Sequence, residues 1–315
     1  ISGYDAQKNI YTTTHTFAGS GTFKITVEDP NRNGGVINIG GGSGSDQQPF
    51  CIASEIVISP FLGANNSVIF SDCPCPEYAC GNTKYCYNPQ AFDPDGDSLS
   101  YRLVACLGFG CNSMAVPLVY QYPDNYGGTI SIDPTSGTLC WDSPSLLGEY
   151  NVAILIEEWR SGIRIGSVLR DIQITVLGNC NNDPPVISDV KDTCIVAGDN
   201  LSFTVIATDP NAADLVTLTG NGSPFSVSNN PASFSTAQST SPVSSSFAWQ
   251  TDCSHIRLAP YEVYFTATDN GSPVQLSDFK KINITVLAPA PTGLVATPSS
   301  GIVNLTWDKS FCNSA

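Results

Sequence analysis

The sequence predicts an all-β protein. Apolar and polar residues alternate with a period of two in short segments such as 22–29 (TFKITVED), 201–209 (LSFTVIATD) and 261–269 (YEVYFTATD). Gly, Pro, Asn and Asp interrupt these segments, and no long segment keeps a period of 3.6 residues. Such alternation is typical of antiparallel strands that are buried on one face. We therefore expect each alternating segment to form one strand of a sheet.

An internal repeat predicts how the strands are grouped. The segment 172–177 (IQITVL) recurs as 282–287 (INITVL), and the offset is 282 − 172 = 110 residues. A strand that begins near a tyrosine, Tyr150 or Tyr261, precedes each copy. About a hundred residues with about seven short strands is the size of an immunoglobulin-like sandwich. We therefore predict tandem sandwiches over residues 61–178 and 179–288.

The joints between the repeats are rich in proline. Residues 178–186 (GNCNNDPPV) and 288–294 (APAPTGL) follow the last strand of each repeat. Proline restricts the backbone, so we expect the sandwiches to form an elongated, semi-rigid array, end to end. Residues 1–60 are interpreted as the C-terminal part of a truncated sandwich, and residues 289–315 as the truncated start of another. On this interpretation Cys312 has its partner beyond the end of the segment.

Composition excludes several classes of function. Asp and Glu number 28 and Lys and Arg number 13, so the net charge is 13 − 28 = −15. Nucleic acids and anionic membranes attract basic proteins, so neither is expected as a partner. No run of 18 apolar residues exists, and no membrane span is predicted. An acidic chain is compatible with binding of cations.

Several motifs resemble known modules of surface proteins. The segments 92–103 (FDPDGDSLSYRL), 130–144 (ISIDPTSGTLCWDSP) and 148–159 (GEYNVAILIEEW) resemble the dystroglycan-type cadherin-like module. The segments 181–186 (NNDPPV) and 267–278 (ATDNGSPVQLSD) resemble the cadherin joint and a cadherin loop. Residues 15–27 resemble the end of a polycystic-kidney-disease-type domain. Residues 291–307 resemble the start of a fibronectin type III domain.

The combination of these modules resembles one family. Together with 28–39 (EDPNRNGGVINI) and 58–68 (ISPFLGANNSV), they resemble large secreted surface proteins of gliding bacteria. That family carries a gliding-motility-associated C-terminal domain and leaves the cell by type IX secretion. The resemblance implies a secreted or cell-surface, non-catalytic stalk, adhesin or fibre-forming protein. Its partners would be other modules of a longer chain, further copies in a fibre, or a surface or glycan ligand.

Calcium is the cofactor that the acidic loops predict. Calcium prefers several oxygen ligands, and Asp93, Asp95 and Asp97 alternate along a loop that contains Gly96. The cadherin resemblance implies a site at each joint between modules. Asn65 and Asn66 would join the first site, and the second would consist of Asn182, Asp183, Asp209, Asp214 and Asp269. The second loop (DPNAAD) lacks the middle aspartate. The alternative is that both loops are Asx-turns without an ion.

Twelve cysteines beside one methionine indicate an oxidising compartment. Four of them fall within 14 residues, and their spacing favours disulfides over a zinc site: Cys73, Cys75, Cys80 and Cys86. Cys106 and Cys111 flank a short LGFG segment and are predicted to close a hairpin. Cys194 and Cys253 are the only cysteines between the two proline-rich joints and are predicted to pair with each other.

Catalysis is not expected. The chain has no GxSxG or HExxH motif, and the adjacent Glu157 and Glu158 should point to opposite faces of one strand. One alternative is an adhesive module that binds carbohydrate or protein through Tyr120, Tyr122 and Tyr126 in a loop-like segment. Another is an accessory region of a secreted hydrolase. Trp141, Trp159 and Trp249 are expected to fill the sandwich cores.

Overall fold

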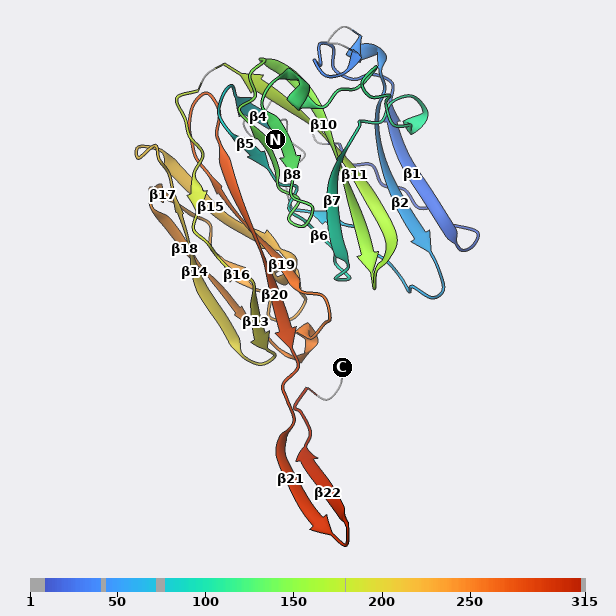
Figure 1. The fold of residues 1–315 in the computed structure, drawn as a ribbon, viewed down its shortest axis with the longest axis vertical. Helices are drawn as coiled ribbons and strands as arrows, with labels where there is room; N and C mark the ends of the chain where they lie inside the picture. The colour runs from blue at the N-terminus through green and yellow to red at the C-terminus, as the bar shows by residue number, and fades with distance from the viewer. Residues whose placement is uncertain (1–8, 41–43, 72–76, 179, 313–315) are drawn as a thin grey trace.

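The computed structural model describes residues 9–40, 44–71, 77–178 and 180–312. It confirms the all-β class, because strands and short 3₁₀ turns make up the ordered elements of these residues. Two β-sandwiches are followed by a two-stranded hairpin (Figure 1). In the described part of the chain, no helix is long and apolar enough to cross a membrane.

The first sandwich is built on a wide sheet in the order β1-β2-β11-β10-β7, with β4 beside β11. Its strands are β1 (Gly21–Asp29), β2 (Phe50–Ile58), β4 (Glu77–Cys80), β7 (Ser98–Val104), β10 (Gly148–Arg160) and β11 (Ile163–Leu177). The long hairpin β10–β11 forms its centre, and β4 runs parallel to β11. Residues of even number on β10, such as Ile154, point into the sandwich core because neighbouring residues alternate between faces.

Shorter strands cover one face of this sheet. They form the sheet β5-β9-β8 and the pair β3-β6, with bounds β3 (Ile69–Phe70), β5 (Tyr85–Tyr87), β6 (Ala91–Phe92), β8 (Thr129–Ile132) and β9 (Leu139–Asp142). Trp141 lies fully buried between the layers and packs edge-on against Tyr150. The 3₁₀ turns of this region are η2 (Ser45–Gln47), η3 (Phe109–Cys111) and η4 (Pro123–Tyr126).

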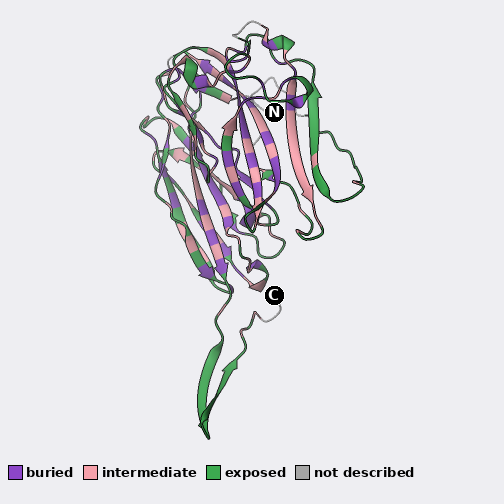
Figure 2. Ribbon diagram, turned by 45° about the vertical axis from the view of Figure 1, so that its right-hand side comes forward, coloured by how far each residue is buried: buried purple, intermediate pink, exposed green. Residues whose placement is uncertain are grey.

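Residues 21–58 belong to the sheet of the first sandwich, which differs from the boundary expected at residue 60. β1 pairs with β2 along its whole length, and β2 pairs with β11 at Gly166–Val168. A disulfide joins Cys51 of β2 to Cys111. The difference arises because β11 is 15 residues long and offers its N-terminal half to an additional strand. Figure 2 shows that β1, at the edge of this sheet, is largely exposed.

The second sandwich consists of two sheets, β12-β14-β18-β16 and β13-β20-β19-β15-β17. Its strands are β12 (Val186–Ile187), β13 (Thr193–Val196), β14 (Asn200–Thr208), β15 (Leu215–Gly222), β16 (Ser233–Phe234), β17 (Ala237–Thr240), β18 (Val243–Gln250), β19 (Tyr261–Thr268) and β20 (Ser277–Leu287). Phe247, Trp249 and Phe265 are buried in its core. The turns η5 (Ser223–Phe225) and η6 (Cys253–His255) connect strands.

The hairpin β21 (Thr292–Ser299) and β22 (Ile302–Asp308) projects from the second sandwich (Figure 1). Every residue of both strands is exposed. The chain returns after β22, and Cys312 forms a disulfide with Cys253 of the second sandwich. The expectation that Cys312 pairs beyond the segment is therefore wrong.

The two sandwiches lie side by side, whereas the proline-rich joint had indicated an end-to-end array (Figure 1). The joint carries Cys180, whose disulfide with Cys80 ties it to the first sandwich. Val274 and Leu276 of the second sandwich pack beside this disulfide. The joint is thus folded back, and one sheet of the second sandwich packs against the first sandwich.

Both predicted disulfides are wrong. Cys111 pairs with Cys51, and Cys106 is a buried free thiol, because the loop places Cys106 in a small core with Tyr120. Cys253 pairs with Cys312, and Cys194 is free because it points outward from β13. Cys80 forms a disulfide with Cys180, and Cys86 forms one with Cys140. Cys73 and Cys75 lie outside the described residues.

Candidate cation centre at the first sandwich

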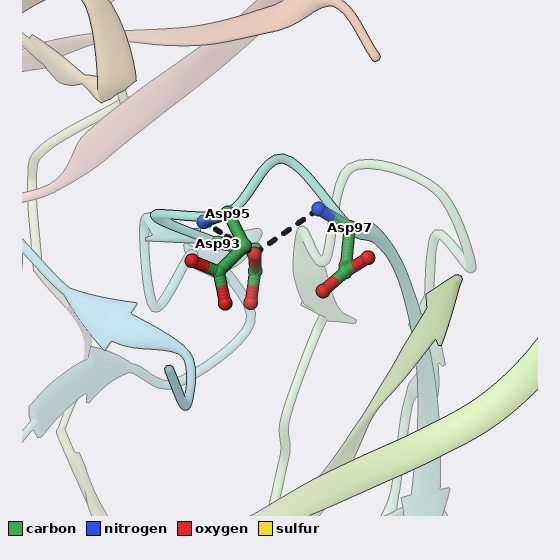
Figure 3. A group of neighbouring side chains, drawn as sticks. All are labelled: Asp93, Asp95 and Asp97. Carbon is green, nitrogen blue, oxygen red and sulfur yellow. Dashed lines mark hydrogen bonds between the residues drawn. The ribbon is translucent and has the colours of Figure 1, made fainter. Parts of the chain in front are cut away.

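The loop between β6 and β7 brings three carboxylates together. Asp93, Asp95 and Asp97 each place one carboxylate oxygen within 4.8 Å of the others (Figure 3). The Asp93 carboxylate also accepts the backbone N–H groups of Asp95 and Asp97, at 2.8 and 3.0 Å. Gly96 turns the loop with a φ of 85°, a conformation that glycine adopts without strain. The predicted alternation of ligands therefore forms one compact cluster.

Asp93 is the buried member of the cluster. The residue is only 2% exposed, and its Oδ2 atom is buried with no hydrogen-bond partner. Burial raises the pKa of Asp93 to about 6, and the negative charges of Asp97 and Glu158 act in the same direction. An unpartnered buried carboxylate oxygen is costly unless a donor or a cation satisfies it.

Glu158 on β10 forms the inner wall of the cluster. It is 1% exposed, and its carboxylate accepts hydrogen bonds from Asn65 Nδ2, Ser67 Oγ and the Val68 backbone N–H. The neighbouring Glu157 lies on the opposite face and pairs with Arg164, as the strand alternation predicted. The sequence analysis did not assign Glu158 to the cation site. Its adjacency to Glu157 on a strand otherwise rich in apolar residues is the signal that could have identified it.

Arg160 is the cation that this cluster already contains. Its guanidinium donates to both carboxylate oxygens of Asp97, at 2.8 and 2.6 Å, and to Asn65 Oδ1 at 3.0 Å. It also lies 3.4 Å from Asp95 Oδ2. Asn66 donates two further hydrogen bonds to Asp95. The hydrogen bonds that Arg160 donates to Asp97 raise the pKa of Arg160. Arg160 thus balances the charge of Asp97, whereas no cationic side chain of the described residues bonds to Asp93.

The donor set fits a hard divalent cation. Carboxylates of Asp93, Asp95 and Asp97 supply oxygen ligands, and calcium takes six to eight oxygens at about 2.3–2.6 Å. The unpartnered Asp93 Oδ2 is the atom that such an ion would satisfy. A bound ion would share Asp97 and Asp95 with Arg160, because the guanidinium contacts both carboxylates.

The second predicted site is more open. In the described part of the chain, only the first cluster brings three acidic, His or Cys ligand atoms within 4.8 Å of one another. Asp269 is occupied, because it accepts the backbone N–H groups of Gly271 and Leu276 and the amide of Asn182. Asp183 is exposed, and its backbone N–H donates to Asn211. The Gly271 contact with Asp269 is that of an Asx-turn, and so is the hydrogen bond from the Asn211 backbone N–H to Asp209.

Two atoms of the second site nevertheless lack partners. Asp209 Oδ2 and Asn182 Oδ1 are buried without a hydrogen bond. Burial raises the pKa of Asp209, and the charges of Asp269, Asp214 and Asp183 raise it further. The predicted residues therefore lie near one another, but as a looser group than the first cluster. Calcium binding at either site stays a prediction.

The first cluster lies against the second sandwich. A Cβ atom at Gly96 would be 3.2 Å from Arg257 Nη1 and 3.3 Å from Ala259 Cβ. A small cavity of about 170 Å³ separates the loop from the second sandwich and is lined by Asp93, Asp97, Arg257, Glu262 and Lys281, among others. Lys281 pairs with Glu262 at 2.5 Å and donates to the Thr135 carbonyl at 2.8 Å.

Tyrosines and amides hold the rest of this contact. Tyr264 is 1% exposed, and its hydroxyl donates to the Ala91 carbonyl at 2.8 Å. The Tyr101 hydroxyl lies 3.4 Å from the Tyr264 hydroxyl. Gln90 donates to Thr266 Oγ1 at 3.1 Å and accepts from Asn221 at 3.0 Å. Tyr264 and Thr266 lie on the face of β19 opposite the core, and alternation alone had predicted that face to be exposed.

The tyrosines proposed as a ligand platform are packed into the protein. Tyr120 is fully buried and bonds to the Asn151 carbonyl. Tyr126 donates to the Ile37 carbonyl and packs against Tyr150. Tyr122 packs against the Tyr120 ring. Trp141 and Trp249 fill cores as predicted, whereas Trp159 is half-buried and bonds to Ser100.

Comparison with known proteins gives structural neighbours only. No family model and no curated protein sequence matches the chain. The Ig1-2 module of the Drosophila receptor protein tyrosine phosphatase DLAR is 13% identical, with 70% of this chain and 100% of that chain covered and a TM-score of 0.26. Drosophila N-cadherin EC1-4 is 14% identical, with 78% of this chain and 60% of that chain covered and a TM-score of 0.25. At these identities and TM-scores, neither neighbour identifies what this chain does.

Proposed function

We propose that this chain is a non-catalytic segment of an extracellular adhesive or stalk protein, whose paired sandwiches are stiffened by calcium. The four disulfides among the described residues fit an oxidising, extracellular compartment. Membership of the gliding-motility-associated family and assembly into fibres belong to the same proposal and rest on the sequence motifs.

The observation that carries the proposal is the position of the first acidic cluster. The cluster holds an unpartnered buried oxygen, and its loop touches the second sandwich at Arg257 and Ala259. A cation there neutralises Asp93 and fixes the loop, so it also fixes the surface on which the second sandwich rests. Mechanical stiffness follows because the joint is already closed by the Cys80–Cys180 disulfide.

Hydrogen exchange tests this function. Residues 1–315, with disulfides intact, are compared in 2 mM calcium and in chelator. We expect slower exchange with calcium at the 93–97 loop and also at 257–260 across the contact. Slower exchange at the 93–97 loop alone would support calcium binding but would contradict stiffening of the contact between the sandwiches. Unchanged exchange at both segments would reject the calcium-stiffened stalk altogether.

Asp95→Asn is the matched variant for this experiment. Asp95 is more exposed than Asp93, and an amide oxygen at this position can keep one of the two hydrogen bonds from Asn66, so the fold is retained. Asp214→Asn in the second group is the control. The first variant should lose the calcium-dependent protection, and the second should keep it at the 93–97 loop.

A further inference from the structure

A second pocket lies on the outer face of the wide sheet, away from the acidic cluster. Its volume is about 320 Å³, which is at the small end of the range for small-molecule sites. β1, β2, β7, β10 and β11 each contribute residues, and the loop after β7 closes one end. The pocket thus lies where the small core around Cys106 and Tyr120 stops and the sheet surface begins.

The floor of this pocket is aliphatic. It consists of Ala53, Val104, Ala105, Leu107, Leu155 and Leu169. Of these, Ala53, Val104, Leu107 and Leu155 are half-buried. Outward-facing positions of a sheet that faces solvent are usually polar. A run of partly exposed aliphatic residues at the base of a pocket is therefore a surface that an apolar group would cover.

The rim of the pocket is cationic in a strongly acidic chain. Its lining residues include Lys24, Arg102 and Arg164 but only one carboxylate, Glu55. Arg164 is paired with Glu55 and Glu157. Arg102 is 57% exposed at its side chain, and its contact with Glu157 is long, at 3.6 Å. Lys24 donates to the Cys111 carbonyl at 2.7 Å.

We propose that this pocket binds a small amphiphilic anion, with an aliphatic body on the leucine floor and a carboxylate at the rim, which Lys24 lines at the β1 side and Arg102 at the β7 side. The floor favours an apolar body because burial removes it from water. The two cations of the rim select the negative head group, since the rest of the chain repels anions. A cationic amphiphile of equal length gains the floor contacts but meets like charge at the rim. This site is independent of the calcium proposal.

Octanoate is the probe for this site. It is titrated into residues 1–315 with labelled Leu and Val methyl groups and followed by NMR. We expect saturable shifts at Val104, Leu107, Leu155 and Leu169, and none at Leu294 or Leu305 of the exposed hairpin. Octylammonium should produce at least tenfold weaker binding because the head group is repelled (about 1.4 kcal/mol). Shifts that are confined to the hairpin, or equal affinity for both amphiphiles, would overturn the proposal.

The double variant Lys24→Gln with Arg102→Gln tests the rim. Both side chains are exposed, so the fold and melting temperature should be retained. Octanoate binding should weaken by about tenfold, and the preference over octylammonium should disappear. Lys191→Gln, an exposed lysine of the second sandwich, is the matched control and should bind octanoate normally. Unchanged octanoate affinity in the double variant would reject the carboxylate position.

Discussion

The two acidic loops of this protein start from similar sequences and end in different structures. DPDGD in the first sandwich gathers three carboxylates within 4.8 Å, whereas DPNAAD in the second leaves Asp209 near Asp269 and Asp214 without such a group. The first cluster is also backed by Glu158 and Arg160 from the neighbouring strand β10. The loop with the middle aspartate is thus the one that gathers three carboxylates, and a charged strand lies behind it.

Among the variants that distinguish the two loops, replacement of Glu158 should have the largest effect on the free energy of unfolding. In Glu158→Ala, the donors Asn65, Ser67 and Val68 N–H lose their buried acceptor, which should lower the free energy of unfolding by about 3 kcal/mol. Denaturant unfolding in chelator measures this loss. Glu157→Ala, one residue away on the exposed face, should cost less than about 1 kcal/mol. Equal losses would show that Glu158 has no special part in the cluster.

Calcium itself should stabilise the first loop and depend on its aspartates. At a hundredfold excess over the dissociation constant, a single site adds about 2.7 kcal/mol to the free energy of unfolding. The gain should vanish in Asp93→Asn with Asp97→Asn, and it should persist in Asp209→Asn, because the second group is looser. Melting curves with calcium and with chelator measure it. A gain that Asp209→Asn abolishes would reverse the ranking of the two loops.

The pH dependence without calcium should report on Asp93. Its pKa in the folded protein is about 6, above the ordinary value of 3.8, so the folded state holds the extra proton between these values. The contribution of Asp93 to the free energy of unfolding is therefore highest below about pH 4, and it falls by about 2–3 kcal/mol as the pH rises to about 6. Calcium binds the deprotonated form, so its affinity should rise over the same range. Asp93→Asn should flatten the pH dependence of stability in chelator, and the pH dependence of calcium affinity in titrations without chelator.

Removal of Arg160 should have the smallest effect. It should increase calcium affinity and decrease stability in chelator. Arg160→Gln removes the guanidinium that shares Asp97, so calcium affinity should increase about threefold to tenfold. The same variant should lose about 1 kcal/mol of stability in chelator. Calorimetric titration measures the first effect and denaturant unfolding the second. A decrease in calcium affinity would mean that Arg160 organises the ligands.

Local sequence patterns predicted the strands, the two sandwiches and the first cluster. Alternation in 261–268 fixes which residues of β19 enter the core, and the DPDGD loop determines its own turn through hydrogen bonds to Asp93. These features depend on contacts between residues close in sequence or on a period of two.

Features that depend on distant segments were not predictable in the same way. Pairing of Cys51 with Cys111 and of Cys253 with Cys312 depends on where loops return, so spacing along the chain was misleading. The buried positions of Tyr264 and Gln90 require a second sandwich beside the first. Glu158 joins the acidic cluster only because β10 runs beside β7.

Calorimetric titration of calcium into disulfide-intact residues 1–315 at pH 7.5 tests the central claim most directly. The first cluster should bind one calcium ion with a dissociation constant in the millimolar range or tighter, and Asp93→Asn with Asp97→Asn should remove that binding. An absence of saturable heat up to 10 mM calcium would contradict the claim, as would binding that survives in this double variant.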